Sequence, residues 1–183
     1  MILDHFPPGF TPRPLQVDVL SKIEEAFDSG KRFVVLEAPP GTGKSHIAAT
    51  LARRYGSTYI CTLTKQLQAQ YLELFTPIGA VELKGKATFD CTECSDSCEV
   101  GSKRFKSPQC AYCPYKIAKA VAMRAALTVC NYASYLYGIR PAKGFNPTRE
   151  LLVLDEGHEV EEVLMDNISI SISAEALPIR IST

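Results

Sequence analysis

One short motif in this sequence has the residue types of a phosphate-binding turn. It runs from Pro40 through Gly41-Thr42-Gly43-Lys44-Ser45. Glycines in such a turn let successive backbone N–H groups point at phosphate oxygens, and the helix that follows adds a partial positive charge. Lys44 is expected to reach the β- and γ-phosphates of a nucleotide, and the Ser45 hydroxyl to ligate magnesium. Ala38 replaces the first glycine of the usual G-x-x-x-x-G-K-[ST] pattern, but both glycines nearest the phosphates remain.

A second motif, Asp155-Glu156-Gly157-His158, follows the apolar run Leu151–Leu154. If that run is a strand, Asp155 stands at the carboxyl edge of a sheet and faces the phosphate-binding turn. Asp155 is then expected to bind magnesium through water, while Glu156 polarises the hydrolytic water. The alternative is the acidic start of a helix, since further acids follow. Because the phosphate-binding turn is also present in the sequence, the magnesium-site interpretation is favoured over the acidic helix start.

Between these two motifs, five of the seven cysteines cluster within residues 91–113, at Cys91, Cys94, Cys98, Cys110 and Cys113. Residues 84–114 hold few aliphatic side chains, so this segment needs another agent to fold it, and a metal centre is the expected one. With Cys94, the set is two C-x2-C pairs separated by fifteen residues, the spacing of a zinc ribbon. With Cys98 in place of Cys94, the spacing of the four cysteines is less regular. Spacing alone favours zinc.

Composition sets the class of protein. The 183 residues suffice for one α/β core with a small insertion, and 46% apolar with 22% charged residues is typical of a soluble globular protein. The sequence has no bilayer-spanning apolar run and no signal peptide, so no membrane partner is expected. A cytoplasmic location, or a nuclear one in a eukaryote, keeps thiols reduced and favours metal ligands over disulfides. Cys61 and Cys130 lie in strand-like runs and are expected to pack in the core.

Charge is unevenly distributed although its net value is zero. Residues 84–124 carry eight Lys or Arg against four Asp or Glu, and residues 150–175 carry eight acids and no base. A basic insertion beside an acidic, magnesium-binding edge suits contact with a phosphate backbone. The alternative is two differently charged solvated faces.

Strand-like and helix-like patterns alternate along the chain. Short β-branched or apolar runs predict strands at 33–36, 58–62, 127–130 and 151–154, the first of them buried on both faces. Helical spacing of apolar residues predicts helices at 14–27, 45–54, 67–74 and 115–126. Isoleucine alternates with serine over 168–173, which predicts a strand or the start of one. The alternation predicts a doubly wound, parallel α/β sheet with helices on both faces.

Asp155-Glu156-Gly157-His158 resembles the D-E-A-H box of superfamily-two helicases, with Gly157 in place of alanine. Further segments, in the family's order, resemble the XPD/DinG-type iron–sulfur helicases. Phe10–Gln16 is similar to their adenine-side motif, and Thr62–Gln70 to the motif that contacts single-stranded DNA. Lys84–Cys91 and Cys113-Pro114-Tyr115 resemble the entry to and exit from the cluster, and Asn131–Leu136 resembles the N-Y-x-x-L segment.

The resemblance implies a RecA-like motor domain that uses ATP and Mg²⁺ and moves 5′-to-3′ on single-stranded DNA. It implies nucleotide contacts from Arg13 and Gln16, and catalytic roles for Lys44, Glu156 and His158, the last coupling nucleotide state to the second motor domain. It also implies a 4Fe–4S cluster in place of zinc, on the cysteines at 91, 98, 110 and 113, with Cys94 as the alternative to Cys98. Nearby Lys103, Arg104 and Lys106 would contact DNA phosphates.

The expected organisation is a motor domain interrupted by an iron–sulfur insertion. Residues 1–83 and 126–183 form the motor domain, and residues 84–125 the insertion. Nothing after Asp166 resembles the second motor domain, so the chain is expected to be half of such a helicase and not to unwind DNA by itself. The competing hypothesis is a metal-stabilised nucleic-acid-binding or regulatory module without autonomous helicase activity.

Overall fold

Four parallel strands form the sheet in a computed structural model that describes residues 1–104, 108–138 and 149–169. Along the sheet the order is β2-β3-β1-β4. The strands are β1 (Thr58–Thr62), β2 (Ala80–Leu83), β3 (Leu127–Asn131) and β4 (Leu151–Leu154). Thr58 pairs with Leu127 on one side and Leu151 on the other, so the three strands start at one level. Lys106 and residues 170–173 of the predicted alternation lie outside the described residues.

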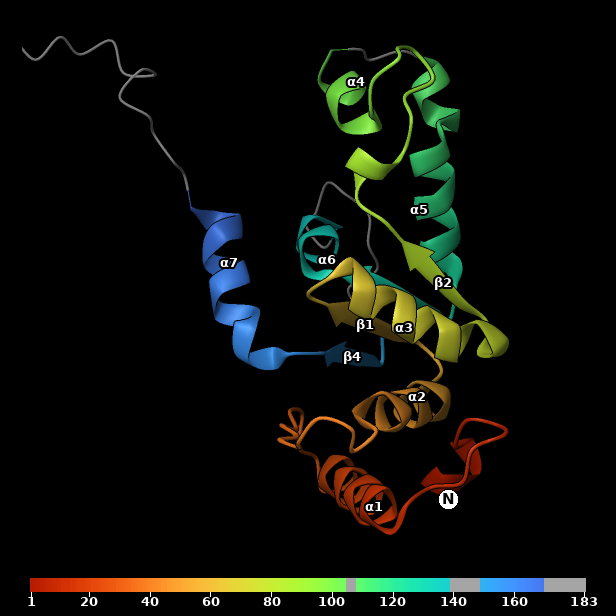
Figure 1. The fold of residues 1–183 in the computed structure, drawn as a ribbon, viewed down its shortest axis with the longest axis vertical. Helices are drawn as coiled ribbons and strands as arrows, with labels where there is room; N and C mark the ends of the chain where they lie inside the picture. The colour runs from red at the N-terminus through yellow and green to blue at the C-terminus, as the bar shows by residue number, and fades with distance from the viewer. Residues whose placement is uncertain (105–107, 139–148, 170–183) are drawn as a thin grey trace, which may run out of the picture.

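Seven α-helices lie within the described residues and surround the sheet (Figure 1). They are α1 (Pro14–Asp28), α2 (Lys44–Tyr55), α3 (Lys65–Phe75), α4 (Cys98–Arg104), α5 (Pro114–Arg124), α6 (Tyr132–Gly138) and α7 (Val160–Ile168). Short 3-10 turns occur at Ile2–His5, Thr76–Ile78, Lys86–Thr88, Pro108–Tyr112 and Gly157–Glu159. Within these ranges no helix is both long and apolar enough to cross a bilayer.

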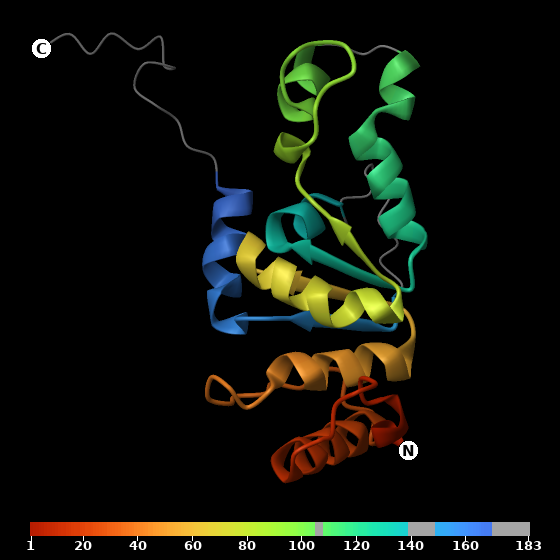
Figure 2. The ribbon, with the colours of Figure 1, turned by 45° about the vertical axis from the view of Figure 1, so that its right-hand side comes forward.

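Both faces of the sheet are covered (Figure 2). Ile60 and Val129 pack in one cluster with residues of α2 and α3. Tyr59 and Cys61 point to the other face, because successive strand residues alternate, and pack with residues of α5 and α6. A third cluster joins α1 and the first 3-10 turn to the outer side of α2. This arrangement confirms the predicted α/β class with helices on both faces.

The strand predicted at Phe33–Leu36 is wrong. These residues carry no ladder hydrogen bonds, and Phe33 and Val35 are 85% and 94% exposed. Only Leu36 packs against a core cluster. A β-branched, apolar run forms a strand only where a neighbouring edge accepts its backbone, and here the segment connects α1 to the phosphate-binding turn without lying along β4.

The strand predicted at residues 151–154 is confirmed as β4. It was expected to be a buried strand, but alternate side chains are exposed. It is an edge strand that pairs only with β1 among the described strands. Leu152 and Leu154 are therefore 40% and 41% exposed, while their neighbours point toward the core.

The cysteine-rich segment leaves the sheet at the carboxyl end of β2 and returns along α5 (Figures 1 and 2). It contains α4 and two 3-10 turns, and an isolated bridge joins Asp90 to Ser97. Its boundaries as a separate domain, 84–125, stay a prediction.

Candidate functional site

The phosphate-binding turn is built around two glycines with left-handed backbones. Gly41 has φ of 78° and Gly43 has φ of 82°, a region that disfavours residues with a side chain. Gly43 is the N-cap of α2, which begins at Lys44. The Lys44 ammonium donates a hydrogen bond to the Ala38 carbonyl at 2.9 Å, and the Thr42 hydroxyl donates to the Pro39 carbonyl at 2.8 Å. The lysine thus closes the turn across the place where phosphates are expected.

Arg13 and Gln16 hold the turn from outside. The Arg13 guanidinium donates to the Gly41 carbonyl at 2.9 Å, and Gln16 Nε2 donates to the carbonyls of Thr42 and Gly43, each at 3.3 Å. Carbonyl and N–H point in opposite directions within a peptide unit, so these donors turn the following amides toward the inside of the loop. Gln16 is buried and its Oε1 accepts from the Arg13 backbone. A direct contact of Gln16 with the base stays a prediction.

Asp155 stands directly after β4, as the strand hypothesis requires. Its backbone N–H donates to the Cys61 carbonyl at 3.0 Å, which extends the β1–β4 ladder. Burial and the Glu156 carboxylate raise the pKa of Asp155, whereas the Tyr71 hydroxyl and the Lys44 ammonium lower it. The Lys44 ammonium of the turn therefore favours the charged form of Asp155.

Beyond Asp155, the His158 side chain is exposed and the Glu156 side chain is partly exposed. Glu156 has φ of 55°, the one positive φ outside glycine in the described residues. His158 lies between two carboxylates, with Nδ1 3.6 Å from Glu156 and Nε2 3.2 Å from Glu159. The imidazole is 69% exposed, and its coupling role stays a prediction.

Two site residues escaped the sequence analysis. Tyr71 was placed on α3 only as an apolar position, and Tyr132 was noted only for its motif. The Tyr132 hydroxyl donates to the Asp155 backbone carbonyl at 2.7 Å. Both tyrosines are buried, and burial is the largest cause of their raised pKa values. The N-Y pair before α6 was the available signal for Tyr132.

A cavity of about 510 Å³ opens beside Ser45. Its apolar wall comes from the N-terminal loop and the end of α3, and its lining is Pro7, Pro8, Phe10, Ser45, Gln70, Glu73, Leu74, Pro77 and Ile78. Phe10 packs edge-on against His46 with ring centroids 4.6 Å apart, and burial lowers the pKa of that histidine. The cavity is large enough for a nucleoside and lies next to the expected phosphate site.

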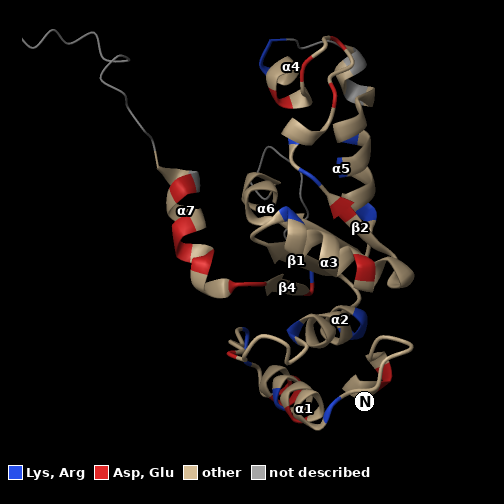
Figure 3. Ribbon diagram, in the orientation of Figure 1, with Lys and Arg blue, Asp and Glu red and all other residues tan. Residues whose placement is uncertain are grey.

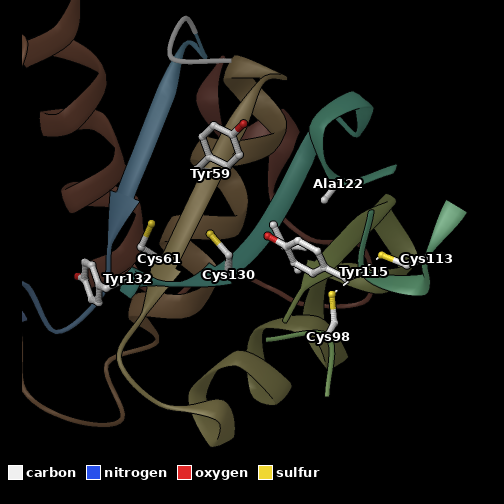
Figure 4. Packing of buried hydrophobic residues seen from close by; sticks show 9 residues of the cluster. Tyr59, Cys61, Cys98, Cys113, Tyr115, Ala122, Cys130 and Tyr132 are labelled. Carbon is white, nitrogen blue, oxygen red and sulfur yellow. Dashed lines mark hydrogen bonds between the residues drawn. The ribbon is translucent and has the colours of Figure 1, made fainter. Parts of the chain in front are cut away.

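Four cysteines line a second, smaller cavity, of about 60 Å³. They are Cys91, Cys98, Cys110 and Cys113. The Cys98 and Cys113 sulfurs are 4.0 Å apart. Figure 4 shows these two side chains beside Tyr115. Burial and the neighbouring Cys113 raise the pKa of Cys98 to about 11. In the described part of the chain, no three His, Cys, Asp or Glu side chains converge closely enough to hold a single metal ion.

Cys94 lies at the edge of this group. Its sulfur and that of Cys91 flank Gly101 of α4, and Cys94 does not line the cavity. The two remaining cysteines, Cys61 and Cys130, pair in register on β1 and β3 and are fully buried, as predicted for core residues (Figure 4).

Lys and Arg lie along α5 and, together with Asp and Glu, on the cysteine-bearing end, whereas α7 carries Asp and Glu without Lys or Arg (Figure 3). Lys86 lines the cysteine cavity, and its ammonium lies 5.5 Å from the ring centre of Tyr115. Lys103 and Arg104 at the end of α4 are exposed and pair with Glu99 and Asp96. Exposed pairs of this kind are weak and leave both cations available to another anion.

The family described as "Type III restriction enzyme, res subunit" matches residues 9–179. This chain belongs to that family. The match covers both the phosphate-binding turn and the Asp155 motif. Its members carry a helicase-like ATPase domain of superfamily two, which hydrolyses nucleoside triphosphates with Mg²⁺ and acts on nucleic acid. No curated protein matches the sequence.

Proposed function

We propose that this chain is the first motor domain of an ATP-dependent DNA helicase of the XPD/DinG type. ATP hydrolysis would drive 5′-to-3′ movement on single-stranded DNA and duplex unwinding, together with a second motor domain. One observation carries this proposal within the family: the four cysteines that line one cavity are the set that the resemblance names for a cluster. The helicase would act in the cytoplasm, or in the nucleus of a eukaryote, where thiols stay reduced.

The nucleotide site divides its work among a few side chains. Lys44 would release the Ala38 carbonyl and neutralise the β- and γ-phosphates, while Ser45 and Asp155 hold Mg²⁺. Glu156 would polarise the attacking water. His158 would pass the state of the site to the second domain. Arg13 and Gln16 would stabilise the nucleotide-binding shape of the turn, with the base beside them.

We infer that the cysteine cavity would hold a 4Fe–4S cluster. A cluster is bulkier than one ion, so its thiolates surround a space instead of converging on a point. When bound, it supplies covalent cross-links between the chain segments that carry its ligands. The ligands would come from the loop before α4, from α4 itself, and from the turn before α5, at Cys91, Cys98, Cys110 and Cys113. That cross-linked unit would present Lys103 and Arg104 to DNA phosphates.

The second candidate is a zinc-stabilised nucleic-acid-binding module. Its support is the spacing of two C-x2-C pairs, Cys91/Cys94 and Cys110/Cys113, which is that of a zinc ribbon. The Cys91 and Cys94 sulfurs also lie together against Gly101 of α4. Zinc bound through the C-x2-C pairs would use Cys94 instead of Cys98.

Metal analysis of anaerobically purified protein separates the two candidates. For the helicase we expect about four irons per chain and a broad absorption band near ~400 nm. Cys98→Ser should lose the iron, whereas the matched variant Cys94→Ser should keep it. A colourless protein with one zinc, lost in Cys94→Ser and kept in Cys98→Ser, would contradict the iron–sulfur proposal.

The motor function is tested separately. ATP hydrolysis by the chain assembled with its second motor domain should rise on addition of single-stranded DNA. Lys44→Ala should lose nucleotide binding, whereas Glu156→Gln should bind nucleotide and lose hydrolysis. Hydrolysis that does not respond to DNA in this assembly would refute the helicase.

A further inference from the structure

The backbone of Asp155 is fixed on both sides. Its N–H donates to the Cys61 carbonyl of β1 at 3.0 Å, and its carbonyl accepts from the Tyr132 hydroxyl at 2.7 Å. Tyr132 is the first residue of α6 and is 4% exposed, so water does not compete for this bond. The peptide between Asp155 and Glu156 is thus held by a buried phenol.

That peptide precedes the one strained residue of the site. Glu156 has φ of 55° and ψ of 48°, a left-handed conformation that costs a residue with a side chain about 1–2 kcal/mol. Such a conformation persists only where the surroundings over-determine it. The Tyr132 bond restrains the peptide plane from which the Glu156 side chain departs. The direction of the Glu156 carboxylate therefore depends on a hydroxyl from α6.

We propose that Tyr132 is a positioning residue that pre-sets the magnesium site by fixing the Asp155–Glu156 peptide. This inference rests on the proposed nucleotide site and extends it to α6. The Tyr132 hydroxyl acts on a backbone carbonyl and not on the nucleotide. Its removal should therefore affect the part of nucleotide binding that depends on Mg²⁺.

The test measures the affinity of a fluorescent ADP analogue for the full chain, with Mg²⁺ and with EDTA. Wild type should bind more tightly with Mg²⁺. Tyr132→Phe keeps the ring and loses one hydrogen bond, so it should lose about three- to tenfold of the affinity with Mg²⁺. Affinity in EDTA should stay unchanged. Tyr55→Phe, at the far end of α2, is the matched control and should behave as wild type in both conditions.

Each other outcome has a distinct meaning. A Tyr132→Phe variant that keeps the full Mg²⁺-dependent gain would overturn the positioning role and leave the nucleotide site standing. Equal losses with Mg²⁺ and with EDTA would also overturn it, because they would indicate general loosening of the fold. A wild-type protein with no Mg²⁺-dependent gain would contradict the proposed nucleotide site itself. If Tyr132→Phe does not fold, hydrogen exchange of the wild-type Glu156 amide tests the same peptide: slow exchange is expected, and exchange as fast as in an unrestrained loop would overturn the role.

Discussion

The Gln16 amide nitrogen fills the space that a side chain on Gly43 would need. A Cβ at Gly43 would overlap with Gln16 Nε2, and the backbone there has φ of +82°. The same amide donates to the Gly43 carbonyl at 3.3 Å. The first helix and the phosphate-binding turn are therefore fitted to one another, and Gly43 is required for two independent reasons.

Gly43→Ala should abolish nucleotide binding and destabilise the protein. The left-handed backbone alone accounts for about 1–2 kcal/mol of unfolding free energy, and the overlap with Gln16 adds to it. Gly41→Ala is the matched control, because Gly41 has a similar φ of +78° but open space around its Cβ position. Chemical denaturation of both variants gives the two free energies.

A double-mutant cycle isolates the overlap. In a Gln16→Ala background, Gly43→Ala should lose only the backbone contribution and so resemble Gly41→Ala. Equal destabilisation by the two glycine substitutions in the wild-type background would show that Gln16 does not restrict Gly43.

Local patterns predicted most of the elements. Helices α1, α2, α3 and α5 were foreseen because apolar residues recur at helical spacing and Pro14 suits a first turn. Strand β2 was missed because Ala80–Leu83 is short and contains a charged residue, and only pairing with β3 makes it a strand. At Phe33–Leu36 the error is the reverse, because a strand was predicted where none forms. The apolar, β-branched composition of this run does not reveal whether a neighbouring strand is available to pair with it.

The two motifs of the site were predictable because each is continuous in sequence. Their mutual contacts were not. Tyr132 and Asp155 are separated by 23 positions, and only the sheet order brings them together. Gln16 was expected at the base, yet its amide is committed to loop carbonyls, a contact that only the packing of α1 beside the turn reveals.

Arg149 should be needed for stability at the amino-terminal edge of the sheet. Its guanidinium donates to the carbonyls of Thr58, Ala122 and Ala126 and to the Thr128 hydroxyl, at 2.6 to 3.1 Å. It also lies 3.8 Å from the ring centre of Tyr59. A lysine has no planar fork and cannot satisfy these acceptors together, so Arg149→Lys should lower the unfolding free energy by about 2–3 kcal/mol.

Arg54→Lys provides the comparison for that measurement. Arg54 is also an arginine stacked near a tyrosine, but it is 43% exposed and makes one ion pair, at 3.6 Å to Glu24. Exposed pairs contribute about 0–1 kcal/mol, so this variant should unfold almost as wild type does. If Arg149→Lys lowers the unfolding free energy as little as Arg54→Lys does, water must satisfy the four acceptors that the guanidinium leaves.

Gln68 is expected to hold α3 to the carboxyl end of the sheet. The side chain is 1% exposed, and its amide donates to the carbonyls of Leu83 and Val129 at 3.2 and 3.3 Å. Gln68→Leu removes both bonds from a dry site and should lower the unfolding free energy by about 1–3 kcal/mol. Gln66→Leu on the exposed side should change it little. Equal effects from the two would contradict the structural role of the buried amide.

Gly101 should be essential for the cysteine site although it lies within a helix. Alanine normally favours a helix over glycine by about 1 kcal/mol, so Gly101→Ala should stabilise α4 if propensity decided the outcome. A Cβ at Gly101, however, would overlap with the Cys91 sulfur and stand 3.2 Å from the Cys94 sulfur. Cys91 must then leave its place, and we expect the variant to lose most of its bound metal.

The measurement is iron and zinc content per chain, with the absorption spectrum, for Gly101→Ala and Gly85→Ala. Gly85 has no atom closer than Ser134 Oγ at 3.8 Å to its Cβ position, so that control should keep its metal. Loss of metal in Gly101→Ala alone would identify Cys91 as a ligand through its fixed position against α4. Full metal content in both variants would show that Cys91 does not bind the metal in this place.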